Sequence, residues 1–91
     1  MTKFKKFIFK KIYNVSCEYW VNMKDIEIQE DFEKHKPRIF KMKQKEDWYS
    51  KHGSFQSSII LNRDFVLVNG YTSYLIAEKY GLGKVPVYFV D

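Results

Sequence analysis

The sequence predicts one small α/β domain (α+β), spanning residues 1–91, with a mixed sheet and two main helices. Of its 91 residues 45% are hydrophobic and 19% aromatic, so large side chains can fill a single core without disulfides. Short apolar runs separated by turn residues indicate strands. Two segments with helical spacing, each ending at a glycine, alternate with these runs, and this order is typical of α/β domains.

Residues 1–28 form a strand-rich N-terminal part. The segment from Phe4 to Tyr13 is rich in aromatic residues and alternates imperfectly, Asn14 to Ser16 suit a turn, and Cys17 to Met23 alternate again. This pattern favours an aromatic hairpin. Residues 29–37 are charged and reach Pro37, which disfavours helical geometry before it, so we expect a connecting loop there.

A helix is predicted over residues 38–53, with Gly53 as its left-handed C-terminal residue. Its apolar stripe, which includes Met42 and Tyr49, is narrow and needs the aliphatic stems of charged residues to complete it. The aromatic residues Trp20, Trp48 and Tyr49 are interpreted as packing anchors in preference to base-stacking residues.

Residues 56–90 are predicted to form the strand–turn–helix–strand core of the domain. The runs Gln56 to Leu61 and Phe65 to Val68 form a hairpin around a three-residue turn, and the second run is expected to be a buried central strand. A helix from Thr72 to Tyr80 stops at Gly81. The final strand runs from Val85 to Val90, with Pro86 tolerated near its start or on an edge.

The junction between the second run and its helix is the candidate binding site. It comprises Asn69, Gly70, Tyr71, Thr72 and Ser73. Helix N-termini carry unpaired backbone N–H groups, and a glycine lets an anion approach them closely. Thr72 or Ser73 would cap the helix and Tyr71 would offer a phenol. In the alternative interpretation, Gly70 serves only the turn, Thr72 only the cap, and Tyr71 only packs.

Charge supports an anionic ligand. The formal net charge is +5, with basic blocks over residues 1–24 and 34–51 and an acidic block over 25–33. Clustered Lys and Arg are typical of nucleic-acid binding, which makes Lys41, Lys43 and Lys45 candidate contacts. A merely solvated surface is the alternative.

Other classes of site and location are disfavoured. No Cys/His ligand spacing is present, so we expect neither a metal nor a cofactor. The single cysteine, Cys17, and the lack of any apolar run near ~20 residues predict a cytoplasmic protein with no membrane partner.

Part of the chain resembles a known family. Ile60-Leu61, the stretch from Val66 to Ala77, Gly81-Leu82 and Val85 to Val87 resemble the N-terminal domain of ParB-like proteins and the related sulfiredoxins, within the ParB-like nuclease domain superfamily. Trp20 to Ile28 is similar to that family's opening strand and loop. The resemblance implies a phosphate-binding Gly-x-x-Arg motif, in which Gly70 matches and Ser73 stands where the family has Arg. Tyr71 stands where sulfiredoxin-like members have their catalytic cysteine.

We therefore expect a non-catalytic or degenerate ParB-like binding module for a phosphate-bearing ligand, with nucleic acid ahead of a free nucleotide. A neutral hydroxyl cannot supply the charged fork of an arginine, so a binding protein is expected rather than an enzyme. Two alternatives stay open. One is a small phosphotransferase or nuclease-like enzyme of the same fold, and the other is a protein-interaction module that uses the aromatic N-terminal hairpin.

Overall fold

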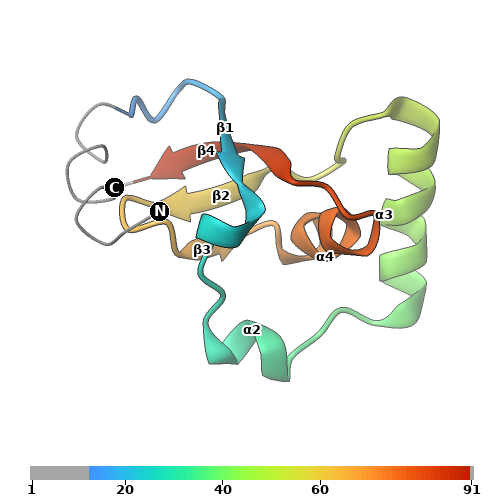
Figure 1. Cartoon of the computed structure of the whole chain (residues 1–91). Helices are drawn as coiled ribbons and strands as arrows, with labels where there is room; N and C mark the ends of the chain where they lie inside the picture. The colour runs from blue at the N-terminus through green and yellow to red at the C-terminus, as the bar shows by residue number, and fades with distance from the viewer. Residues whose placement is uncertain (1–12, 91) are drawn as a thin grey trace.

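The computed structural model describes residues 13–90 and shows a four-stranded mixed sheet with helices beside it (Figure 1). The elements, in chain order, are β1 (Tyr19–Asn22), a 3₁₀ turn η1 (Met23–Asp25), α2 (Glu30–Lys34), α3 (Ile39–His52), β2 (Ile59–Asn62), β3 (Leu67–Asn69), α4 (Tyr71–Lys79) and β4 (Lys84–Val90). Helix α4 contacts both β2 and α3. The two main helices of the predicted α+β fold are therefore α3 and α4.

The strand order in the sheet is β1-β4-β2-β3. Strand β4 pairs antiparallel with β1 and parallel with β2, while β2 pairs antiparallel with β3. The C-terminal strand is therefore central. Its Pro86 lies opposite Trp20 of β1, and pairing with β2 begins only at Val87, so the missing N–H of proline falls before the parallel ladder.

The core lies on one face of β2 and β4, where buried residues alternate with partly exposed ones, as the period of a strand requires. Its fully or almost fully buried apolar side chains are Ile59, Leu61, Phe65, Leu67, Ile76, Ala77, Val85, Val87 and Phe89. Tyr13 stacks on Phe89 with ring centroids 4.2 Å apart, which ties the start of the described chain to the central strand.

The hairpin of β2 and β3 is confirmed, but the central position predicted for Val66 to Val68 is wrong. Strand β3 is the edge of the sheet, and Val68 is 44% exposed. The edge is partly covered, since Glu27 exchanges backbone hydrogen bonds with Phe65 and Leu67, each of 2.9 Å. A run of four apolar residues cannot reveal which of its sides lacks a partner.

The aromatic hairpin predicted at the N-terminus lies largely outside the described residues. Residues 1–12 of the predicted hairpin lie outside the described residues, and β1 has β4 as its described partner. The interpretation of Trp20 as a core anchor is wrong, since this side chain is 65% exposed while the neighbouring Val21 is buried. Alternation along a strand sends one of two adjacent side chains outward.

The loop predicted over residues 29–37 contains the short helix α2. Phe32 packs against Tyr71 with ring centroids 5.3 Å apart, and Lys34 forms an ion pair with Glu30 at 3.1 Å. The loop prediction is therefore wrong over these five residues, because a contact with α4, distant in sequence, supports the helix.

Helix α3 begins and ends within one residue of its predicted bounds, and Gly53 adopts the left-handed conformation with φ 70°. None of its residues is buried, and Ile39 is 88% exposed. Tyr49 packs against Phe55 and Tyr80, as expected of an anchor, whereas Trp48 stays exposed and stacks on His52. The helix is held by few side chains.

Candidate functional site

A pocket of about 250 Å³ opens at the N-terminus of α4, and we call it the Gly70 pocket. It is lined by Phe32, His35, Pro37, Lys41, Lys45, Ser57, Asn69, Gly70, Tyr71 and Thr72. It therefore brings together four of the five residues predicted at the junction with two of the three predicted lysines. The lysines come from α3, which lies beside α4 (Figure 1).

Gly70 lies directly against the backbone of Ser58 and Ile59, at the start of β2. Its φ is +86°, and a Cβ on this residue would lie 2.3 Å from the carbonyl oxygen of Ser58. No L side chain fits there. The Asn69 side chain accepts a hydrogen bond of 2.8 Å from the Gly70 N–H. The junction of Asn69 and Gly70 therefore places the first helical turn of α4 against the segment that precedes β2.

The predicted side-chain cap is wrong. The N-cap of α4 is Gly70, which has no side chain, and Ser73 is buried with its hydroxyl donating a hydrogen bond of 2.6 Å to the carbonyl of Ser57. The N–H groups of the first turn have no acceptor within the helix. The N-terminus of α4, which is the positive end of the helix dipole, lines the Gly70 pocket.

Of the two lysines that line the pocket, Lys45 is the less exposed. Its ammonium donates to the hydroxyl of Ser57, so Ser57 receives one hydrogen bond from α3 and one from α4. Lys41 lies one helical turn earlier and is exposed. The two therefore share a face of α3, because residues four apart in a helix lie one above the other.

Lys43 does not belong to this pocket. It lines a separate cavity with Pro37, Ile39, Met42, Glu46 and Lys79. There Lys79 forms an ion pair with Glu46 at 2.6 Å, and this hydrogen bond raises the pKa of Lys79. The sequence contained a signal for this separation, since residues four apart in a helix share a face and residues two apart do not.

Four lining residues were not predicted as part of the site: Phe32, His35, Pro37 and Ser57. Phe32 and His35 come from α2 and the residue after it, and the His35 Nδ1 lies 3.0 Å from the carbonyl oxygen of Asp31. Ser57 precedes β2 in a segment that carries no motif. No local pattern marks these residues, because only tertiary packing brings them to α4.

Tyr71 is 7% exposed, so it is one of the most enclosed side chains of the pocket. Burial raises the pKa of its phenol, and the carboxylates of Glu33 and Glu78 raise it further. The hydroxyl group is therefore a neutral hydrogen-bonding group at neutral pH, available as donor or acceptor.

No group of three His, Cys, Asp or Glu side chains among residues 13–90 could hold a metal ion. Within the same range, no helix is both long enough and apolar enough to cross a membrane.

The architecture has counterparts among solved structures. A pNOB8-like ParB N-domain, in its C2221 crystal form, matches with a TM-score of 0.69 and 23% identity over 82% of this chain. The chain has the fold of ParB N-terminal domains. A second structure of the pNOB8-like ParB N-domain matches over the same share with a TM-score of 0.64 and 25% identity.

A third match is the C-terminally truncated chromosome-partitioning protein ParB from Caulobacter crescentus, complexed with CTP-gamma-S. It has a TM-score of 0.63 and 14% identity over 82% of this chain. The chain spans 30%, 28% and 44% of the lengths of these three structures. No protein-family model and no curated protein matches the chain. The ParB-like fold expected from the residues between Gln56 and Val90 is thereby confirmed.

Proposed function

We propose that this chain is a binding module for a phosphate-bearing ligand, held in the Gly70 pocket. The observation that carries the proposal is the meeting of two lysines from α3 with the uncapped N-terminus of α4 in one pocket. Backbone N–H groups at a helix N-terminus and lysine ammonium groups are both typical phosphate ligands.

In this proposal the N–H groups of Tyr71 and Thr72 donate to the phosphate oxygens, and Lys41 and Lys45 supply the charge. Lys45 supplies the positive charge that, by the resemblance, an arginine at the position of Ser73 would supply. The ammonium of Lys45 is already placed by Ser57, whose carbonyl accepts the hydrogen bond from Ser73. Each charge-assisted hydrogen bond contributes about 1.5–3 kcal/mol.

Binding is favoured over catalysis by the composition of the Gly70 pocket. None of the described residues that line it is Asp, Glu or Cys, so the pocket offers neither a carboxylate base nor a thiol nucleophile. Its histidine, His35, has Nδ1 3.0 Å from the carbonyl oxygen of Asp31, and no carboxylate among these lining residues is present to orient it as a base. We accordingly propose that the protein does not hydrolyse nucleotides, which a phosphate-release assay with CTP and ATP measures.

Nucleic acid is the proposed ligand and a free nucleotide the alternative. The net charge of +5 supports a longer polyanion. The structure of the Caulobacter crescentus ParB contains CTP-gamma-S, which supports a nucleotide in the same fold.

The experiment measures binding of fluorescent single-stranded DNA, double-stranded DNA, RNA and CTP at low salt. The double variant Lys41→Ala/Lys45→Ala should weaken the preferred ligand by about tenfold or more, since each tenfold is about 1.4 kcal/mol. The matched control is Lys43→Ala/Lys51→Ala, which removes the same two charges from the same helix outside the pocket. If the wild-type chain shows no saturable binding of any of these ligands, the proposal is wrong. Equal losses in the variant and the control would also contradict it.

A protein-interaction module is a second candidate, favoured by one observation. Trp20 is 65% exposed on β1, the outermost strand at one side of the sheet that residues 13–90 form, and exposed tryptophans are enriched where proteins associate. Light scattering at rising protein concentration tests self-association as the simplest case. An association that Trp20→Ser abolishes would support this function, and a monomer at every concentration would count against it.

A further inference from the structure

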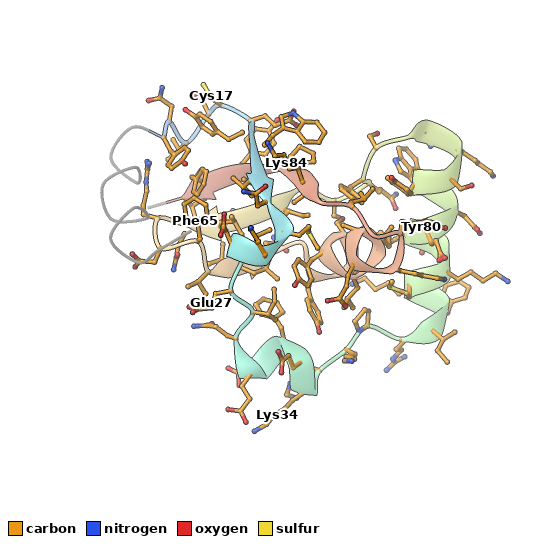
Figure 2. All side chains as sticks on the ribbon, viewed as in Figure 1. Cys17, Glu27, Lys34, Phe65, Tyr80 and Lys84 are labelled. Carbon is orange, nitrogen blue, oxygen red and sulfur yellow. The ribbon has the colours of Figure 1, made fainter. Side chains whose placement is uncertain are left out.

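A second pocket, of about 330 Å³, lies between α2 and α4, and we call it the Tyr74 pocket. It is lined by Ile28, Glu33, Lys36, Tyr71, Tyr74, Leu75 and Glu78. Tyr71 lines this pocket and the Gly70 pocket alike. Side chains of both helices stand in the space between α2 and α4 in Figure 2.

Two aromatic rings form one wall of the Tyr74 pocket. Tyr71 and Tyr74 are three residues apart on α4 and share a face of it. Their rings are almost parallel, with an interplanar angle of 16° and centroids 6.3 Å apart. Phe32 of α2 packs against Tyr71 and holds that ring in place.

Two carboxylates face these rings from different helices. Glu33 belongs to α2 and Glu78 to α4. Both raise the pKa of Tyr71 and of Tyr74, in addition to the larger effect of burial. Both acidic residues line the same pocket as the two rings.

The Tyr71 side chain is 7% exposed and lines both pockets. Its phenol can donate or accept a hydrogen bond.

We propose that the Tyr74 pocket binds a small organic cation, an alkylammonium or guanidinium group. Aromatic faces attract such cations. The carboxylates of Glu33 and Glu78 supply the opposite charge, and the hydroxyl of Tyr71 accepts a hydrogen bond from the N–H of the ligand. A free diamine and the arginine side chain of a peptide both carry this chemistry.

Lys36 also lines the pocket and brings a like charge to its rim. In this arrangement it opposes a bound cation. Removing its charge should therefore strengthen binding, which is the opposite of what a merely structural role of Lys36 would produce.

The test is a calorimetric titration of the whole chain with putrescine and, in a second arm, with a short arginine-containing peptide. Glu33→Gln/Glu78→Gln should weaken binding by about tenfold or more, and Tyr74→Leu should weaken it by a similar factor. Lys36→Gln should strengthen it. The matched control is Glu30→Gln, which removes one charge from α2 at a residue paired with Lys34 and outside the pocket. Circular dichroism of each variant shows that the fold is kept.

Saturable binding that follows this pattern in either arm supports the proposal, and the stronger arm identifies the source of the cation. Absence of binding in both arms would refute it. An equal loss in Glu30→Gln would also refute it, because the attraction would then be nonspecific. These titrations contain no phosphate ligand, so their outcome does not depend on the function proposed for the Gly70 pocket.

Discussion

The hydroxyl of Ser73 donates a hydrogen bond of 2.6 Å to the carbonyl of Ser57, and this bond joins the first turn of α4 to the segment before β2. The side chain of Ser57 in turn accepts a hydrogen bond from Lys45 of α3. The position at which the resemblance leads one to expect a phosphate-binding arginine therefore has a structural role here. The positive charge comes to the pocket from another helix.

Ser73→Ala should lower the free energy of unfolding by about 1 kcal/mol, because the hydrogen bond between Ser73 and the carbonyl of Ser57 would be lost. Urea denaturation measures the change. Thr72→Ala, a neighbouring substitution at a half-buried residue, should change stability by no more than about 0.5 kcal/mol. Equal effects of the two substitutions would contradict a specific role for the Ser73 bond.

Leu67→Ala should cost about 2–5 kcal/mol of stability, since it removes a fully buried side chain and leaves a cavity. The control is Val68→Ala on the same strand, where the side chain is 44% exposed and the loss should stay below about 1 kcal/mol. A loss below that value for Leu67→Ala as well would argue against the placement of β3.

Gly70→Ala and Gly53→Ala separate two effects of a left-handed glycine. Both residues have positive φ, and an alanine at either should cost about 1–2 kcal/mol. At Gly70 the Cβ would also meet the backbone of Ser58, whereas nothing lies within 4 Å at Gly53. Crowding should therefore add about 1–3 kcal/mol at Gly70 alone. Equal destabilisation, measured by thermal and urea unfolding, would mean that the close approach to Ser58 relaxes at no cost.

Binding of a polyanion should weaken steeply with salt. For a nucleic-acid ligand, the slope of log affinity against log salt concentration should become less negative by about one for each phosphate-contacting lysine removed. Lys41→Ala/Lys45→Ala should accordingly change it by about two. A slope unchanged in the double variant would remove these lysines from the interface even if the affinity falls.

Stability should decline as the pH rises above about 10, the ordinary pKa of tyrosine. Burial raises the pKa of Tyr13, Tyr71 and Tyr74 from 10.0. Above pH 10 the unfolded chain therefore releases these protons while the folded chain keeps them, which favours unfolding. Tyr74→Phe removes one of these protons and should lessen the decline. Urea denaturation from pH 8 to 11 compares the two proteins, and parallel curves would show that Tyr74 does not contribute.

The order of elements after Gln56 could be predicted from local signals. Asn62 to Asp64 form the turn between β2 and β3, where the side-chain oxygen of Asn62 accepts hydrogen bonds from the N–H groups of Asp64 and Val66. Gly53 and Gly81 end the two main helices with positive φ. Turn and glycine chemistry acts within a few residues, so the sequence alone reports it.

Much of the candidate site could be predicted in the same way. The strand–Gly–helix junction located Asn69, Gly70, Tyr71 and Thr72, and the basic block located Lys41 and Lys45, all of which line one pocket. The junction did not distinguish Ser73, whose side chain turns inward to Ser57. Which side of a helix faces solvent depends on what packs against it.

The amino-acid sequence by itself determined the class of fold, the bounds of α3, and the glycine turn that begins α4, because short-range backbone preferences decide these features. Only the tertiary structure decided that β4 is central, that β3 is an edge, that α2 forms against Tyr71, and that Lys41 and Lys45 part from Lys43. These outcomes depend on contacts between residues far apart in the chain. Such contacts form only when the free energy gained by burial outweighs the entropy cost of closing the chain. No local pattern records this balance.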